Sequence, residues 1–237
     1  MDDTRKVWTL CGINIIMKDS GKAEEDICHT INVQQTGGCF MIIKQYIKDF
    51  EKTYTPDKQK NAVLGGVLYL VGTPIGNLSD VSPRAVAAFE SCDFIAAEDT
   101  RVSLTLLNHF GIRKPLVSYF EHNKRERGEQ ICRRLLDGEN AVLVTDAGMP
   151  AISDPGEDIV RRCADAGICV SVIPGASAAV SALALSGLST ARFCFEGFLP
   201  SDKKEKQQIL FELKEETRTI ILYEAPHYLI RTLEELK

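Results

Sequence analysis

The chain has 237 residues, of which 44% are hydrophobic, enough for one large or two small globular domains. Its formal net charge of -5 excludes a globally basic nucleic-acid-binding protein, although a local basic surface remains possible. No apolar run reaches the length of a membrane span, and no signal peptide is recognisable. We therefore expect a cytoplasmic protein without a membrane partner.

The eight cysteines and four histidines show no arrangement typical of a disulfide framework or a metal site. No two cysteines form a Cys-x-x-Cys pair, and the histidines share no ligand spacing. We expect reduced thiols and no bound metal.

Residues 1–63 differ from the rest of the chain, because polar and apolar residues alternate there without a sustained period. Residues 41–52 could form one amphipathic helix, and the polar segment 53–60, which contains Pro56, is typical of a linker. We interpret residues 1–63 as an N-terminal extension and linker. This extension is either an accessory arm or a segment without function, with Met41 as an alternative start.

From residue 64 onward, short apolar runs alternate with helical patterns, which predicts an α/β class with mainly parallel strands. The predicted strands are 67–71, 94–97, 115–119, 141–145, 169–173, 193–196 and 219–223. The predicted helices are 84–91, 103–110, 124–136, 156–166, 177–185, 203–216 and one beginning near residue 228. We expect the buried stripe of the 124–136 helix to consist of Ile131, Leu135 and Leu136.

A change near residues 174–178 predicts two domains, an N-terminal α/β domain at 64–175 and a C-terminal one at 176–237. The second domain is expected to be incomplete, because about sixty residues are few for an independent core.

Five loops rich in small residues follow predicted strands: 72–77, 97–101, 146–150, 174–178 and 223–227. The first, Gly-Thr-Pro-Ile-Gly-Asn, has neither the Walker nor the dinucleotide-binding spacing. In a parallel sheet such loops converge at one edge, where α/β proteins bind ligands. Helix capping would explain Asp146, Asp154 and Ser177 individually, but a ligand site explains the five loops together.

Seven segments in order are LVGTPIGNLSD, AAEDTR, HFGI, VTDAGMPAISDPG, PGASAAVSAL, FEGFLP and YEAPHYL. Together they resemble the tetrapyrrole-methylase-like superfamily of S-adenosylmethionine-dependent methyltransferases. Within it, they are most similar to the 2'-O-ribose methyltransferases of a decoding-region cytidine in small-subunit (16S) rRNA. The resemblance covers about residues 66–237 and implies two α/β domains with the cofactor in the cleft between them.

The resemblance also implies which residues bind S-adenosylmethionine, largely through the backbone. They are Ile75, Ala147, Gly148, Met149, Ile152, Ser177, Ala178 and Glu224. The methionine carboxylate is expected at the amino end of the helix that begins near Ser177. Four positions depart from the family pattern: Met149 stands where Thr is usual, Ala176-Ser177 replaces Pro-Cys, and Tyr228 stands where Arg is common.

A ribose hydroxyl is a poor nucleophile, so a general base or a polarising cation would assist methyl transfer. The candidate catalytic residues are Glu98, Asp99, Arg101 and His122, with Glu121 and Asn123 as further possibilities. Asp99 and Arg101 could instead form a structural ion pair, and His122 could be structural or contact RNA.

The expected partner is small-subunit rRNA or the assembled 30S subunit, and relatives suggest a homodimer. Basic residues cluster at 113–114, 124–127, 133–134 and 203–206, and the loop 198–206 is the preferred RNA contact. Two alternatives remain: a non-catalytic cofactor- or RNA-binding remnant of the family, and a methylase of a tetrapyrrole.

Overall fold

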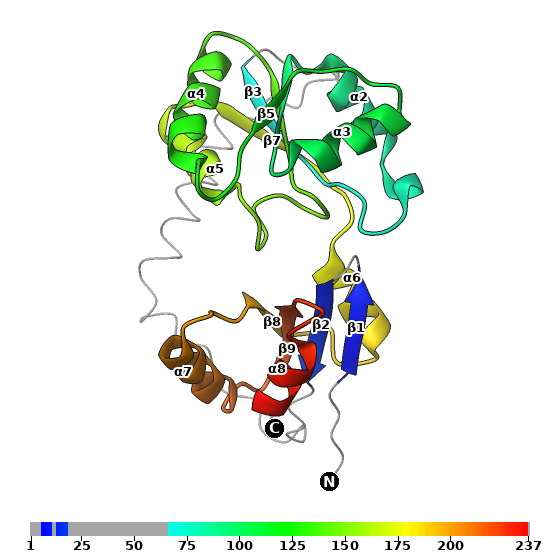
Figure 1. Ribbon diagram of the computed structural model, residues 1–237, viewed down its shortest axis with the longest axis vertical. Coiled ribbons are helices and arrows are strands. Elements are labelled where there is room, and N and C mark those ends of the chain that lie inside the picture. Colours follow the sequence, from blue (N-terminus) through cyan, green and yellow to red (C-terminus); the bar gives the residue numbers. More distant parts are fainter. Residues whose placement is uncertain (1–5, 11–12, 19–65, 237) are drawn as a thin grey trace. The chain divides into compact units, whose positions relative to one another are not determined.

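The computed structural model describes residues 6–10, 13–18 and 66–236, which contain two β-sheets and their helices (Figure 1). The helix predicted at 41–52 and the linker predicted at 53–60 lie outside the described residues. In the described part of the chain, no helix is long and apolar enough to cross a membrane.

The first sheet is fully parallel and has the order β5-β4-β6-β3-β7. Its strands are β3 Val67–Val71, β4 Phe94–Ala97, β5 Leu116–Ser118, β6 Ala141–Val144 and β7 Cys169–Ile173. The connecting helices are α2 Pro83–Ser91, α3 Thr100–His109, α4 Lys124–Leu136 and α5 Glu157–Asp165, preceded by the short 3-10 turn η1 Leu78–Asp80. The predicted α/β class is confirmed.

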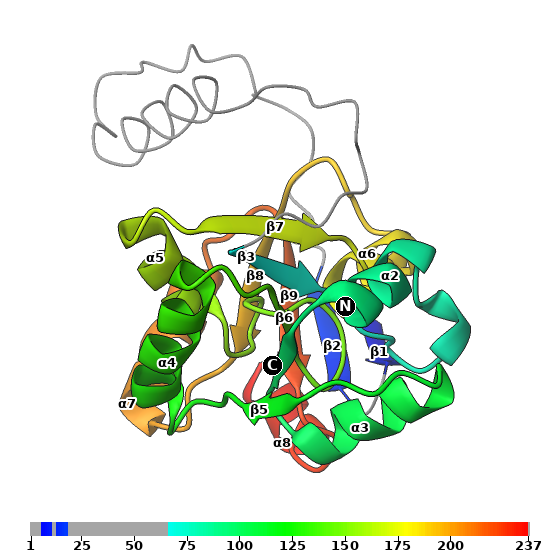
Figure 2. The ribbon, with the colours of Figure 1, turned by 90° about the horizontal axis from the view of Figure 1, so that it is seen from above.

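Helices cover both faces of this sheet, which explains why its strands are continuous apolar runs (Figure 2). Leu68 and Leu70 of β3 pack with α4 and α5 in one core cluster. The next residue along, Val71, packs with α2 and α3 in a second cluster. Alternate residues of each central strand thus enter opposite cores.

Two details of the helices differ from expectation. Helix α3 begins at Thr100 rather than 103, because the Asp99 carboxylate accepts a hydrogen bond from the Arg101 amide and caps the helix. In α4, Leu136 is 63% exposed, so its predicted place in the buried stripe was wrong. Cys132 is buried in the stripe instead. Its thiol faces α5, where its Sγ lies 3.9 Å from the Sγ of Cys163.

The second sheet is mixed and has the order β1-β2-β9-β8. Its strands are β1 Lys6–Leu10, β2 Ile13–Lys18, β8 Phe193–Phe198 and β9 Thr219–Glu224. Its helices are α6 Ala178–Ser186, α7 Lys203–Leu213 and α8 Leu229–Glu235. Helix α6 packs on one face of the sheet, through Ile221 and Tyr223 of β9. Leucines of α7 and α8 pack on the other face, against Leu222 of β9.

The hairpin β1–β2 occupies an edge of this sheet, with β2 antiparallel to β9 and residue 15 opposite Tyr223. Sequence reasoning placed residues 6–18 in an extension outside the fold, whereas the structure places them in the second sheet. Polar–apolar alternation in this segment is the pattern of a strand, and the partner strand lies about two hundred positions away, which no local pattern reveals.

Deleting residues 1–20 should lower the melting temperature, because it leaves the backbone of the buried strand β9 without a partner on one side. Circular dichroism on heating measures the loss. Adding a synthetic peptide of residues 1–20 should restore the melting temperature. An unchanged melting temperature after the deletion would show that the hairpin contributes nothing to the sheet.

Candidate functional site

Two backbones cross in direct contact where β3 and β7 end. The Gly72 amide donates to the Ile173 carbonyl at 3.2 Å. A Cβ atom at Gly72 would lie 2.6 Å from the Gly175 Cα, so a side chain at either glycine is excluded. This crossing fixes the loop after β3 against the segment that leads into α6.

The loop after β6 is fixed to the loop after β3 by backbone hydrogen bonds. The Thr73 amide donates to the Gly148 carbonyl at 2.9 Å, and the Gly148 amide donates back to Thr73 at 3.2 Å. The Thr73 hydroxyl donates to the Thr145 carbonyl at 3.1 Å. Three of the five loops singled out in the sequence are therefore held together.

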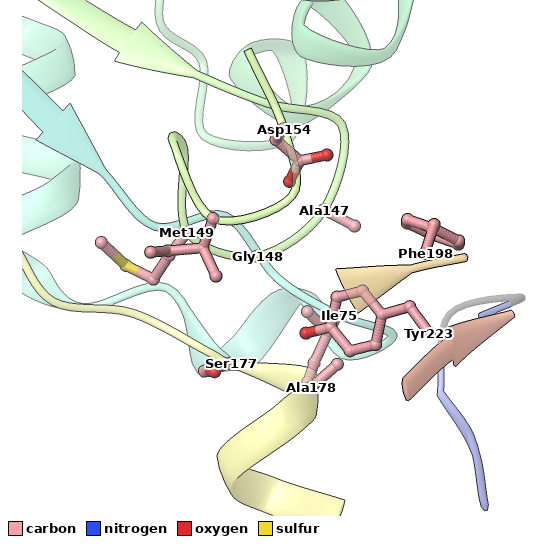
Figure 3. Close-up of a pocket in the computed structure, with 10 residues that line it drawn as sticks. Ile75, Ala147, Gly148, Met149, Asp154, Ser177, Ala178, Phe198 and Tyr223 are labelled. Carbon is pink, nitrogen blue, oxygen red and sulfur yellow. The ribbon is translucent and has the colours of Figure 1, made fainter. Parts of the chain in front are cut away.

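A pocket lies where these loops meet α6, β8 and β9 (Figure 3). Its lining consists of Ile75, Ala147, Gly148, Met149, Ile152, Asp154, Ser177, Ala178, Phe198 and Tyr223. The structure thus brings together every residue predicted to bind the cofactor except Glu224. Three further residues, Asp154, Phe198 and Tyr223, were not among those predicted.

Glu224 lies elsewhere. Its carboxylate is buried and accepts hydrogen bonds from the Thr232 hydroxyl at 2.6 Å and from the Ala225 amide at 2.8 Å. It lines a different pocket, between α7 and α8. Its role in the structure is to anchor the start of α8 to the end of β9.

Aromatic side chains form the β8–β9 side of the pocket. The Tyr223 hydroxyl accepts a hydrogen bond from the Ala179 amide at 3.1 Å, which ties the first turn of α6 to β9. Phe198 packs edge-on against Tyr223, with ring centroids 5.5 Å apart, and remains 45% exposed. Ser177 occupies the N-cap position of α6 without a capping hydrogen bond from its side chain, so the capping explanation for Ser177 was wrong.

Three carboxylates gather beside the pocket: Glu98 after β4, Asp146 after β6, and Asp154 in the pocket lining. Burial raises the pKa of Asp154 to about 7, and the negative charge of Glu98 adds to this shift, while the nearby Thr145 hydroxyl opposes it. Burial also raises the pKa of Glu98 and that of Asp146. Asp154 can therefore exchange a proton near neutral pH.

Sequence reasoning missed Asp154 because it lies two residues before a helix start, where Asp is usually a cap. The structure shows Gly156 at the N-cap of α5 with no side-chain cap, so this explanation was wrong. Asp146 likewise caps no helix of its own: its Oδ1 accepts a hydrogen bond from the Asp99 amide at 3.1 Å, which joins two loops. Glu98 and Asp146 lie within two residues of a strand end, but Asp154 lies well beyond the end of β6, so no sequence spacing pointed to it.

Asp99 and Arg101 form the ion pair that was considered as the structural alternative. Arg101 Nε lies 3.0 Å from Asp99 Oδ1, and Nη2 lies 2.6 Å from Oδ2. The hydrogen bonds from Arg101 lower the pKa of Asp99 to about 2, which makes this carboxylate a weak proton acceptor at neutral pH. The Arg101 side chain is 89% exposed and remains accessible to a ligand.

The residues of the turn after β5 lie outside the lining of the pocket. His122 is exposed and packs edge-on against Phe120. Glu121 pairs with Lys124. The Asn123 side chain holds the turn, because its Nδ2 donates to the Ser118 carbonyl and its Oδ1 accepts from the Phe120 backbone amide.

Comparison with known proteins agrees with this geometry. The sequence profile of the tetrapyrrole (corrin/porphyrin) methylases matches residues 67–237. The chain belongs to the tetrapyrrole methylase family. The predicted resemblance is therefore confirmed.

The curated relatives it matches include proteins named "Ribosomal RNA small subunit methyltransferase I". The relative from Synechocystis sp. is 53% identical over 172 residues, or 73% of this chain and 62% of its own length. The relative from Haemophilus influenzae is 49% identical over 174 residues, which are 73% of this chain and 62% of that protein. The relative from Thermotoga maritima is 46% identical over 171 residues, which are 72% of this chain and 77% of that protein. The chain thus spans less than two thirds of the length of the first two.

Replacing Asp154 by Asn should change how the stability of the protein depends on pH. The pKa of Asp154 is raised in the folded state, so the native protein holds a proton that the unfolded chain releases. Stability is therefore lost as pH rises from about 4 to about 7. Asp154→Asn removes this loss, and its melting temperature should fall less over that interval than that of the parent.

Asp165→Asn, at the exposed end of α5, is the matched control and should follow the parent. Parallel pH curves for the parent and Asp154→Asn would refute the raised pKa.

Proposed function

We propose that this chain carries the cofactor-binding part of an S-adenosylmethionine-dependent methyltransferase. The substrate is the ribose 2'-hydroxyl of a cytidine in the decoding region of small-subunit rRNA. The observation that carries the proposal is the single pocket that collects seven residues from the loops after β3 and β6 and the start of α6. The names of the relatives support an rRNA substrate rather than a tetrapyrrole.

The pocket suits S-adenosylmethionine by its small residues. Gly148 has φ +93°, and a Cβ there would lie 3.6 Å from Ile75 Cγ2 and 3.7 Å from the Ala176 carbonyl oxygen, in the space between the two loops. Ala147 and Ala178 likewise leave the backbone accessible, so amides and carbonyls can bind an adenine and a ribose. The start of α6 favours a carboxylate, although the Tyr223 hydroxyl already engages the Ala179 amide.

When bound, S-adenosylmethionine would supply a sulfonium methyl group, which leaves a neutral thioether on transfer. The residues of the chain then have two tasks. The pocket holds the donor while the substrate aligns its hydroxyl oxygen with the methyl carbon. Asp154, with its pKa near 7, accepts the proton that the ribose hydroxyl loses, and Glu98 stabilises the protonated form by its adjacent negative charge.

Two lysines of the predicted RNA loop are available for phosphate. Lys203 and Lys204 are exposed at the start of α7, whereas Lys206 is paired with Glu235 of α8. Among the other basic clusters, Arg134 is paired with Glu139 and stacks 3.5 Å above the Phe94 ring, which is a structural role. The homodimer and the cytoplasmic location stay predictions.

Replacing Ala147 by Leu should weaken S-adenosylmethionine binding at least about tenfold, because the added atoms occupy the pocket that the cofactor needs. Gly148 is a poorer test position, since its positive φ would strain any side chain. Isothermal titration calorimetry measures the affinity. Ala87→Leu, on an exposed position of α2, is the control and should bind like the parent. Equal affinities would remove the pocket from the cofactor site.

The substrate is tested by transfer of a tritiated methyl group to small subunits assembled without the modification. A 2'-O-methyl group protects the adjacent phosphodiester, so alkaline hydrolysis should leave the label in a dinucleotide. Replacing Lys203 and Lys204 by Gln should weaken RNA binding and reduce the slope of log affinity against log salt by about 0.7 per lysine. Label on a base, or transfer to a porphyrin precursor in preference to RNA, would refute the proposed substrate.

A further inference from the structure

A second pocket, of about 300 Å³, lies on the α3 side of the same two loops. Four apolar side chains contribute to its lining: Pro74, Leu78, Val102 and Leu106. Leu78 and Val102 are 44% and 43% exposed, so they present apolar surface at its mouth. A volume at the lower end of the ~300–1,000 Å³ typical of small-molecule sites suits one ring rather than a whole nucleotide.

The polar residues in the lining are four hydroxyl side chains, Thr73, Ser103, Thr105 and Thr145, and one carboxylate, Asp146. The Thr145 hydroxyl is fully buried and interacts with the Asp154 carboxylate of the first pocket, so it is not exposed to a ligand here. Asp146 Oδ1 is engaged by the Asp99 amide, and no hydrogen bond within the described part of the chain engages Oδ2. Asp146 is also the one charged residue that the described lining contains. The pocket therefore repels phosphate and offers a fixed carboxylate acceptor to a neutral ligand.

The pocket adjoins the proposed cofactor site through the chain itself. Asp146 and Pro74 line this pocket. The residues that follow them in the chain, Ala147 and Ile75, line the proposed cofactor pocket. Neighbouring Cα atoms are about 3.8 Å apart, so the two pockets adjoin along the same pair of loops. A group bound here lies beside the cofactor pocket and outside it.

We propose that this pocket binds the pyrimidine base of the target nucleotide and selects cytosine over uracil. The inference rests on the proposed function, because it places the base of that substrate. A base taken out of its stack packs between apolar side chains and is read along its hydrogen-bonding edge. Cytosine directs its N4 amino group to Asp146 Oδ2, the pairing by which carboxylates recognise cytosine. Uracil presents O4, an acceptor, to the same carboxylate and is repelled.

The test measures affinity for two short single-stranded RNAs that differ in one central cytidine or uridine, by fluorescence anisotropy with the full chain. The parent should prefer the cytidine RNA by roughly tenfold. Val102→Trp fills the pocket and should abolish the preference. Leu104→Trp, on the same helix, 49% exposed and outside the pocket lining, should keep it.

Asp146→Asn tests the assignment without filling the pocket. The Asn oxygen can keep the hydrogen bond from the Asp99 amide, which directs its NH₂ group to the position of Oδ2. A donor there favours uracil O4, so the preference should reverse toward uridine.

Calorimetry with S-adenosylmethionine separates this inference from the proposed function. Unchanged cofactor binding in Val102→Trp, with the base preference lost, supports the pocket. A parent that binds both RNAs equally or binds neither, or Val102→Trp and Leu104→Trp variants that behave alike, would overturn the pocket and leave the cofactor site intact. A parent that does not bind the cofactor would overturn the proposed function, whatever the base preference.

Discussion

The close backbone crossing of Gly72 and Gly175 determines where both pockets can form. A Cβ at either residue would come within 3 Å of backbone atoms of the other strand end, which no rotamer change can relieve. The crossing brings the loop after β3 against the start of the segment that leads to α6, and the Thr73–Gly148 pair then positions the loop after β6. The loops meet through their backbones, so only small residues fit at these positions. The glycines are therefore required by the crossing itself, as well as by any ligand that contacts the loops.

Electrostatics divides the acidic residues near these loops into two kinds. Asp99 is held ionised by Arg101, and its carboxylate caps α3, so it serves the structure. Among the described residues, no cation is hydrogen-bonded to Glu98, Asp146 or Asp154, and each of the three has a raised pKa. A region with three such carboxylates is unfavourable for phosphate. Under the proposed function, an RNA backbone would therefore bind at a distance, at lysines such as Lys203 and Lys204, while a hydroxyl or a base edge would enter the acidic region.

Sequence patterns predicted the first sheet well because its strands are buried on both faces and each is followed by a helix with a recognisable boundary. Ser82-Pro83 begins α2 as expected, and the Ser82 hydroxyl accepts from the Ala85 amide. The α3 start was missed by three residues because the cap belongs to Asp99, which was considered as a catalytic residue or an ion-pair partner but not as a cap. Pairing of β2 with β9 joins positions too distant in sequence for any local pattern.

The site shows the same division between local and tertiary information. Most pocket residues were predicted because they lie in loops that follow parallel strands. Such loops meet at one edge of the sheet whatever conformation each loop adopts. Asp154 was missed because a raised pKa depends on which other carboxylates are near in space. The four carboxylates considered, Glu98, Asp99, Asp146 and Asp154, look equivalent in the sequence, and only the position of Arg101 separates Asp99 from the rest.

Glu224 marks a different error, one that the sequence could have avoided. Successive residues of a strand face opposite sides of a sheet, so Tyr223 and Glu224 cannot both line one pocket on the same face. Ile221 and Tyr223 pack on α6, while Ile220 and Leu222 pack on the α7–α8 side, and Glu224 continues that second series. Because Ala178 and Ala179 at the start of α6 are buried against the first series, the residue of β9 that reaches the proposed cofactor pocket has to be Tyr223. Its hydroxyl meets the Ala179 amide there, and the Glu224 carboxylate meets Thr232 on the opposite face.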